Sequence, residues 1–144
     1  MLIRRMTKDD IEEVATIEAN NFSQPWSENA FQKAMESPDN ILLVAQEEDK
    51  ILAYACMYVS FDEGEITNVA VSEDYRGRGI GSQIMTAVFE QALQKQINRI
   101  VLEVRVSNLP AIALYRKTGF VELGIRKGFY DLPKEDAYIM ERSF

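Results

Sequence analysis

Three observations predict an α/β fold with a mixed sheet for this chain. It has 144 residues, of which 47% are hydrophobic, and this size suits one domain with a core of its own. Apolar runs of strand length alternate with polar turns. Segments with helical spacing of apolar residues separate some of these runs. The predicted order is β-α-α-β-β-β-α-β-α-β-β, in a single domain that covers residues 1–144.

The N-terminal part of the chain is predicted to hold one strand and two helices. Residues 2–5 suit a short first strand. Thr7 followed by Asp10 resembles a capping box, and it opens a helix with one apolar face. Ser27 can cap a second helix, which ends before Pro38.

Three consecutive strands are predicted next. The apolar runs 41–46 and 51–61 flank the polar residues 47–50, which is the pattern of a β-hairpin. A second turn at residues 62–64 leads into a third run, residues 65–71. Consecutive strands joined by short turns pair antiparallel, so we expect a meander.

The C-terminal part is predicted to add a strand, a short helix and a hairpin. Residues 99–106 are apolar and β-branched, as is typical of a buried strand. Asn108 can cap a short helix that ends just before Gly119. The last two strands, residues 120–127 and 137–142, can pair with each other.

The composition excludes several kinds of reactive site. The chain has no histidine, which removes Ser-His and Cys-His nucleophilic schemes and all His-based zinc sites. Cys56 is the only cysteine, so no internal disulfide can form and thiolate metal sites are removed too. Cys56 lies in an apolar run, where a small buried side chain is the expected role. We therefore expect no metal site.

The charge and the apolar runs restrict the partners and the location. The formal net charge is -7, from 16 basic and 23 acidic residues, so we expect no general binding to nucleic acids. No apolar run is long enough to cross a bilayer, and we expect no membrane segment. The first residues also lack the apolar stretch of a secretory signal, so we expect a cytoplasmic protein.

A glycine-rich loop joins a predicted strand to a helix that runs from about residue 79 to residue 95. Glycine allows positive φ angles and lets a ligand approach the main chain closely. The helix N-terminus adds unpaired N–H groups and the positive end of the helix dipole, and together these features hold a phosphate or pyrophosphate. The glycines and arginines of the loop are Arg76, Gly77, Arg78, Gly79 and Gly81.

Other roles for this loop fit the spacing less well. A flexible turn that caps a helix would not need the glycines, the arginines and the helix start together. A P-loop needs Gly-Lys-Ser/Thr, and Gly81-Ser82 lacks the lysine. A dinucleotide fingerprint begins correctly at Gly77, and Glu103 could be its ribose-binding acid, but Ser82 occupies the third glycine position. The loop is also too long, and the meander does not suit a doubly wound sheet.

The pattern Arg76-x-x-Gly79-x-Gly81 resembles the Q/R-x-x-G-x-G/A signature of the GNAT N-acetyltransferases. The preceding Asn68-Val69-Ala70-Val71 and the order of elements are similar to that family as well. The resemblance implies that the loop amides hold the pyrophosphate of acetyl-CoA and that the edge of the preceding strand binds the pantetheine arm. The implied cofactor-binding residues are Val69, Ala70, Val71, Arg76, Gly77, Arg78, Gly79, Ile80, Gly81, Ser82 and Asn108.

Glu103 and Tyr115 are the candidate catalytic residues. Glu103 interrupts an apolar strand, and such departures often mark functional sites. An ion pair with Arg105, on the same strand face, explains Glu103 equally well. Tyr115 follows Asn108 by two helical turns, so both should face the same way, with the small Ala111 between them. A core aromatic is the alternative role for Tyr115.

The segment from Leu102 to Phe120 resembles the L-E-V-R-x-S-N-x-x-A-I-x-L-Y-x-x-x-G-F block of the RimI-type ribosomal-protein alanine N-acetyltransferases. Pro25-Trp26-Ser27 and residues 128–140 are similar as well, so the resemblance covers essentially the full chain. It implies Glu103 as the proton acceptor and Tyr115 as the proton donor.

The same resemblance implies the substrate, which is the N-terminal alanine of the eighteenth small-subunit ribosomal protein. The peptide N-terminus would then lie between Trp26 and Tyr130, and a structural role for either aromatic residue is an equal alternative.

Acetyl transfer requires a neutral amine. An α-amino group has a pKa of about 8 and a lysine amine one of about 10.4, so an α-amine needs only a modest base. A carboxylate with a raised pKa could serve, directly or through water, and the absence of histidine favours direct attack of the amine on the thioester. Two alternatives remain, which are acetylation of a lysine or small-molecule amine and a non-catalytic CoA-binding module.

Overall fold

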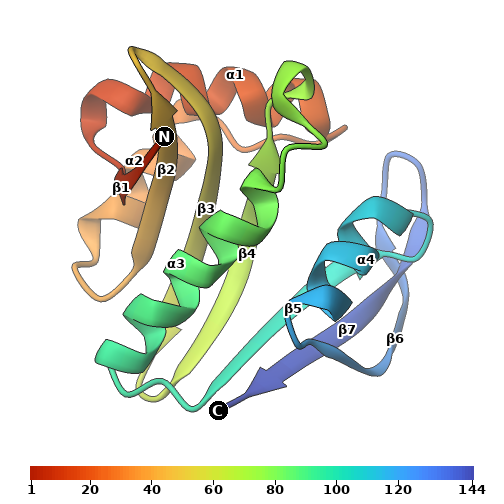
Figure 1. Ribbon diagram of the computed structural model, residues 1–144. Coiled ribbons are helices and arrows are strands. Elements are labelled where there is room, and N and C mark those ends of the chain that lie inside the picture. Colours follow the sequence, from red (N-terminus) through yellow and green to blue (C-terminus); the bar gives the residue numbers. More distant parts are fainter.

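The computed structural model describes all residues, 1–144, and confirms the predicted order of elements (Figure 1). The strands are β1 (Leu2–Arg5), β2 (Ile41–Glu47), β3 (Lys50–Ser60), β4 (Glu63–Val71), β5 (Arg99–Arg105), β6 (Val121–Tyr130) and β7 (Glu135–Ser143). The helices are α1 (Ile11–Asn21), α2 (Glu28–Glu36), α3 (Ile80–Gln94) and α4 (Leu109–Lys117), with 3₁₀ turns at Lys8–Asp10 and Glu73–Tyr75. None of the helices combines the length and the apolar character that a bilayer crossing needs.

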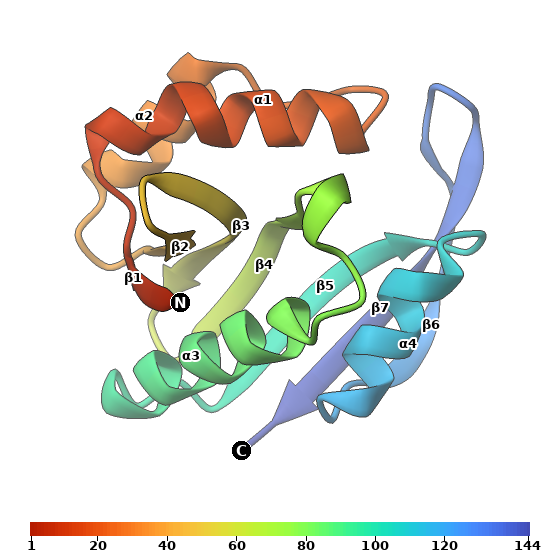
Figure 2. The same cartoon turned by 45° about the horizontal axis from the view of Figure 1, so that its top comes forward.

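One seven-stranded sheet, in the order β1-β2-β3-β4-β5-β7-β6, separates two layers of helices. Helices α1 and α2 cover one face, and α3 and α4 cover the other (Figure 2). The alternation of side chains along β2 supplies both cores. Ile41 and Leu43 belong to the core under α3, whereas Leu42 and Val44 belong to the core under α1 and α2. Because β2 is buried on both faces, its sequence is a continuous apolar run and does not alternate between apolar and polar residues.

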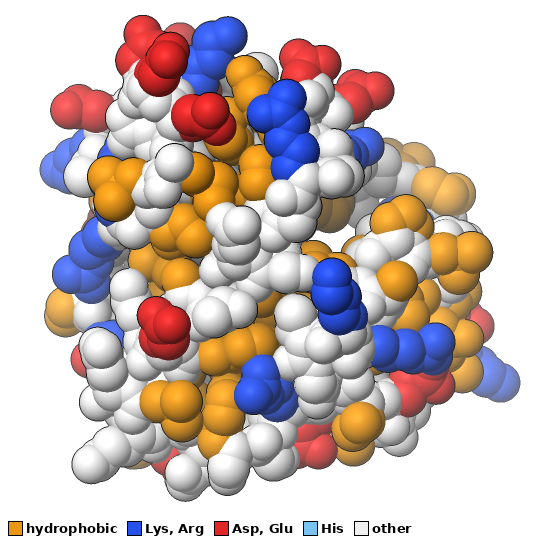
Figure 3. Space-filling view, viewed as in Figure 1, with side chains coloured by type: hydrophobic (Ala, Val, Ile, Leu, Met, Phe, Trp, Pro, Cys, Tyr) orange, Lys and Arg blue, Asp and Glu red, His pale blue; other side chains and the backbone are white.

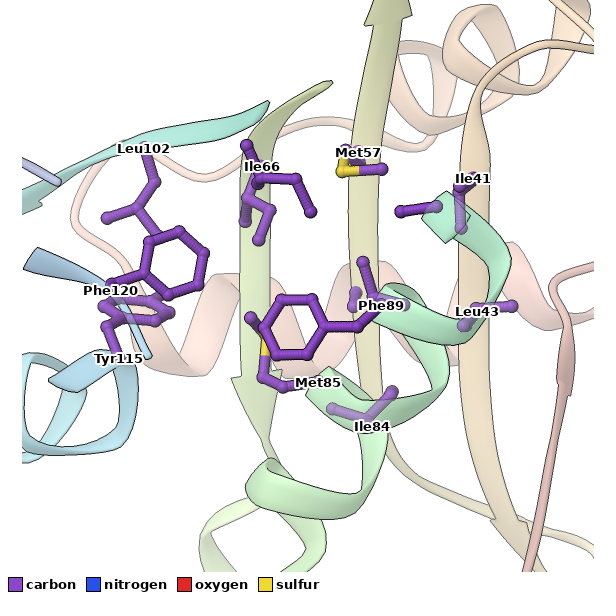
Figure 4. Close-up of a cluster of buried hydrophobic side chains, with 14 of the residues drawn as sticks. Ile41, Leu43, Met57, Ile66, Ile84, Met85, Phe89, Leu102, Tyr115 and Phe120 are labelled. Atoms are coloured by element: carbon purple, nitrogen blue, oxygen red, sulfur yellow. The ribbon is translucent and has the colours of Figure 1, made fainter. Parts of the chain in front are cut away.

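The core under α3 extends across the sheet to α4. Met85 and Phe89 of α3 belong to the same buried cluster as Leu102 of β5 (Figure 4). At the β5 end of this cluster the ring of Tyr115 lies edge-on to Phe120, with 5.7 Å between ring centroids. The packing therefore fixes the position of α4, and of Tyr115 on it, relative to β5.

The sheet opens between β4 and β5. These strands pair in parallel only over Glu63–Glu65 and Arg99–Val101, and beyond these pairs they diverge (Figures 1 and 2). A bulge on the other side of β4 contributes, because the register with β3 steps from Ile66 to Asn68 and leaves Thr67 as the extra residue. The facing backbone edges of β4 and β5 are thus free of sheet partners near their C-terminal ends, and the functional side chains gather at this gap.

Candidate active site

The glycine loop begins where β4 ends and leads directly into α3. Gly77 and Gly79 have φ angles of 81° and 76°, a left-handed conformation that side chains other than glycine rarely adopt. A Cβ added to either would meet no atom within 4 Å, so open space adjoins this backbone. Gly79 is also the N-cap of α3, so the free N–H groups of the helix start at this point. Gly81 has another role, because a Cβ there would lie 3.2 Å from Leu114 of α4.

A cavity of about 630 Å³ lies beside this loop, and we call it the α3 cavity. It is bounded by the end of β4, the glycine loop and the start of α4. Nine of the eleven residues predicted to bind the cofactor line it, namely Val69, Ala70, Val71, Arg76, Gly77, Gly79, Ile80, Gly81 and Asn108. Arg78 and Ser82 do not line it, and the Arg78 guanidinium lies 5.1 Å from the centre of the Tyr75 ring. Contact with a cofactor stays a prediction for all eleven residues.

Arg76 connects the loop to the opposite helical layer. Its Nε donates to the Val71 carbonyl at 3.4 Å, and its Nη2 donates to Oδ1 of Asn21 at the end of α1. The guanidinium is thereby held at the edge of the α3 cavity, which it lines. The loop therefore combines a fixed positive charge, free amides and space, and these properties fit a pyrophosphate.

A second cavity, of about 520 Å³, lies on the α1 side of the sheet, and we call it the α1 cavity. Trp26 and Tyr130, which were predicted to contact the substrate, line it together with Glu103, the predicted proton acceptor. The two cavities meet at the gap between β4 and β5, since they share the lining residues Asn21, Phe22, Val69, Arg105, Asn108, Ala111 and Tyr115. In the face shown in Figure 3, the surface is hollowed between the parts that carry α3 and α4.

Glu103 lies on the α1-cavity face of β5, opposite its buried neighbours Leu102 and Val104. Partial burial is the main cause that raises the pKa of this carboxyl, and the charge of Glu65 adds to it. Arg126 acts in the opposite direction, with its Nε 3.7 Å from Glu103 Oε1. The predicted alternative, an ion pair between Glu103 and Arg105, is wrong. The Arg105 guanidinium instead forms an ion pair with Glu135 and donates to backbone carbonyls of the β6–β7 turn.

Tyr115 lines both cavities and is 7% exposed. Burial raises the pKa of its hydroxyl, so the group stays protonated. The two roles considered for Tyr115 are compatible, since its ring packs in the core while the residue forms part of both cavity walls. Asn108, the N-cap of α4, and Ala111 face the same cavities, as their spacing predicted.

Trp26 and Tyr130 both line the α1 cavity, and both also have structural contacts. The Trp26 ring packs edge-on against Phe31, with 5.2 Å between centroids. The Tyr130 ring lies under the Arg105 guanidinium, 4.4 Å from its centroid. Burial, followed by the charge of Glu103, raises the pKa of Tyr130 to about 12. Each residue therefore combines a structural contact with a position in the cavity wall.

The sequence did not single out Glu18, a second carboxylate in the α1 cavity. Glu18 is 2% exposed and accepts hydrogen bonds from the Trp26 backbone at 3.0 Å, from Asn68 Nδ2 at 2.9 Å and from the Tyr54 hydroxyl. Burial and the Glu18 charge raise the pKa values of both Tyr54 and Cys56, which suits inert, buried groups. The sequence contained a sign of this role, because a glutamate on the apolar face of a helix is buried and then requires hydrogen-bond donors around it.

Comparison with known proteins agrees with this geometry. Residues 10–120 match the model of the acetyltransferase (GNAT) family. A Bacillus subtilis (strain 168) protein provisionally named ribosomal protein bS18-alanine N-acetyltransferase is 37% identical over 139 residues, or 96% of this chain and 92% of that protein.

Two solved structures extend the comparison. The ribosomal-protein alanine N-acetyltransferase of Escherichia coli is similar with a TM-score of 0.90 at 30% identity, over 99% of this chain and 92% of that one. A GNAT acetyltransferase of Elizabethkingia anophelis, solved with acetyl-CoA bound, has the same fold, with a TM-score of 0.79 at 22% identity over 99% and 97% of the two chains. With its family model matched over most of its length, the chain belongs to the GNAT family of N-acetyltransferases.

Proposed function

We propose that this protein transfers the acetyl group of acetyl-CoA to the α-amino group of a protein N-terminus, namely the N-terminal alanine of ribosomal protein bS18. One observation carries the proposal. The cavity beside the glycine loop and the cavity that holds Glu103 meet at Tyr115, between the diverging strands β4 and β5. Two substrates can therefore enter from opposite faces of the sheet. The names of the Bacillus and Escherichia relatives support the choice of acceptor.

The α3 cavity suits acetyl-CoA. The amides around Gly79 and the charge of Arg76 would hold the pyrophosphate. The free edge of β4, from Val69 to Val71, would pair with the amide groups of the pantetheine arm, and Asn108 would contact the cofactor near the gap. When bound, acetyl-CoA supplies the thioester that the acceptor amine attacks.

The α1 cavity suits the acceptor amine. Glu103 accepts a proton from the incoming amine, directly or through a water molecule, and its raised pKa makes it a better base than an exposed carboxylate. The neutral amine then attacks the thioester carbonyl without a covalent enzyme intermediate. As the C–S bond breaks, Tyr115 donates its proton to the departing thiolate and takes up the second proton of the attacking nitrogen, and its raised pKa keeps the hydroxyl protonated until that step.

Replacement of Tyr115 by Phe is expected to lower kcat about 10- to 100-fold, because a proton donor is lost while the ring remains. Acetyl-CoA affinity and thermal stability should change little, since the phenyl ring can keep its contact with Phe120. Steady-state kinetics and thermal melting would measure both effects. Tyr138→Phe is the matched control, because Tyr138 packs against the same core and lines neither cavity. An unchanged kcat for Tyr115→Phe would assign Tyr115 to the core alone.

The acceptor is tested by thiol release from acetyl-CoA with two peptides of equal length. One begins with a free Ala-Arg N-terminus and contains no lysine. The other has a blocked N-terminus and one internal lysine. We expect release with the first peptide only, because its α-amine is roughly 200-fold more often neutral near pH 7 than a lysine amine. Preference for the lysine peptide would contradict N-terminal specificity, and no release with any amine would contradict the proposed activity.

A further inference from the structure

Arg105 joins four segments at one edge of the α1 cavity. Its Nη1 donates to the Pro133 carbonyl at 2.8 Å and to Glu135 Oε1 at 3.1 Å. Its Nη2 donates to the Leu132 carbonyl at 3.4 Å and reaches Ser23 Oγ, in the loop between α1 and α2, at 3.5 Å. The guanidinium at the end of β5 thus holds the turn between β6 and β7 and touches the loop on the opposite side of the cavity.

Two further contacts complete this arrangement. The Tyr130 ring packs against the guanidinium at 4.4 Å, which is within the range of a cation–π interaction. The other oxygen of Glu135, Oε2, accepts a hydrogen bond from the Ser107 amide at 2.9 Å. Glu135 is therefore fixed by the same strand end that carries Arg105. Ser23, Tyr130, Leu132 and Pro133 all line the α1 cavity, so Arg105 connects parts of its wall.

The sheet itself holds this end of the hairpin weakly. The register between β6 and β7 shifts once between Glu122 and Gly124, and it shifts again after the Arg126–Ala137 pair, where the next pair is Tyr130 and Glu135. The residues between Arg126 and Tyr130 have no ladder partners, and the Gly128 amide donates to the side chain of Asp136, at Oδ1, at 2.8 Å. Tyr130 regains a ladder partner in Glu135, but the turn that follows it is held by side-chain contacts, among them the hydrogen bonds from Arg105.

We propose that Arg105 is a positioning residue for the acceptor, in that it fixes the β6–β7 turn and Tyr130 as one wall of the α1 cavity. The inference rests on the proposed function, because it assumes that the α1 cavity receives the acceptor amine. Arg105 acts through Tyr130 and the turn, and takes no part in proton transfer. Glu103 lies two residues away on the same strand face and lines the same cavity. A fixed Tyr130 and turn therefore keep the shape of the cavity around Glu103 constant.

An arginine is required here by the number and direction of the contacts. The planar guanidinium donates to acceptors from three segments at once and stacks on an aromatic ring, whereas a lysine ammonium is a compact point charge on a flexible chain. The increase in peptide KM should therefore be smaller for Arg105→Lys than for Arg105→Met, but it should not disappear.

The test measures kinetics for the N-terminal peptide and for acetyl-CoA separately. Arg105→Met should raise the KM of the peptide about 10-fold or more, with Arg105→Lys in between. Arg105 itself lines both cavities, but the turn and the Tyr130 ring that its guanidinium holds line only the α1 cavity. The Kd of acetyl-CoA should therefore change far less than the peptide KM, by about twofold at most. Amide hydrogen exchange should become faster in residues 129–135 and stay unchanged in the glycine loop. Arg116→Met is the control, since Arg116 also pairs with a carboxylate, Glu122, but lines neither cavity.

The inference would be overturned if Arg105→Met weakened the binding of peptide and acetyl-CoA equally. Unchanged amide hydrogen exchange in residues 129–135 would also overturn it. If Arg105→Met does not fold, Glu135→Gln removes the ion pair from its other side and should raise the peptide KM in the same direction. The exchange measurement needs no substrate. A wild-type enzyme that fails to acetylate the peptide therefore counts against the proposed function, while faster exchange in Arg105→Lys would still support the positioning role.

Discussion

Glu103→Gln is expected to lower kcat about 100- to 1,000-fold while the Kd of acetyl-CoA stays nearly constant. The amide keeps the size of the carboxylate but cannot accept the proton of the amine. Glu103 lines only the α1 cavity, so the cofactor side should not be affected. Steady-state kinetics with a saturating peptide and calorimetric titration of acetyl-CoA would measure the two quantities. Near-normal turnover would remove Glu103 from the mechanism.

The pH dependence gives this prediction a second readout. Burial raises the pKa of Glu103, and the proposed mechanism requires its ionised form. Wild-type kcat should therefore fall as the pH drops through this raised pKa, which lies above that of an exposed glutamate. Glu103→Gln should lose this acidic limb and follow only the ionisation of the substrate amine. Glu122→Gln is a suitable control, because Glu122 pairs with Arg116 and lines neither cavity, and its profile should match the wild type.

Gly79→Asp is expected to weaken acetyl-CoA binding about 100-fold or more. The new carboxylate would lie in the open space beside the left-handed backbone, where the pyrophosphate is proposed to bind. Like charges a few ångströms apart repel by several kcal/mol, and each 1.4 kcal/mol, approximately, changes a binding constant tenfold. Calorimetric titration of CoA, which needs no acceptor, is the direct measurement.

A matched variant separates charge from backbone strain in this experiment. Gly79→Asn has nearly the same shape as Gly79→Asp, and asparagine tolerates a left-handed conformation better than most residues do. It should reduce affinity much less than the aspartate does, and thermal melting should show similar stability for both variants. Equal affinities for the two variants would point to shape alone, and unchanged CoA binding in Gly79→Asp would overturn the assignment of the loop.

Local patterns in the sequence were sufficient for the element order and for most of the α3 cavity. The meander, the glycine loop and the Asn108 cap each depend on residues close together in the chain, and all three lie where predicted. The predicted helix start at Gly79 was one residue early, because Gly79 is the left-handed N-cap and α3 begins at Ile80. Such a shift is usual where a helix begins from a glycine turn.

The pairing of charges was the part that the sequence could not predict. Glu103 and Arg105 share a strand face, and their proximity in the chain suggested an ion pair. In the structure Arg105 binds Glu135, 30 positions away, and the cation nearest to Glu103 is Arg126. Pairing depends on which strands lie side by side, and β7 is placed between β5 and β6 only by the sheet topology.

The sequence by itself determined the proposed phosphate site, since a glycine loop at a helix N-terminus is formed by consecutive residues. Only the tertiary structure decided the acceptor side. Glu18 is bonded to Asn68, 50 positions away, and Arg105 reaches Ser23, 82 positions away. These contacts arise because the divergence of β4 and β5 lets loops from both ends of the chain converge on one cavity. That convergence is a property of the packed sheet and has no local signature.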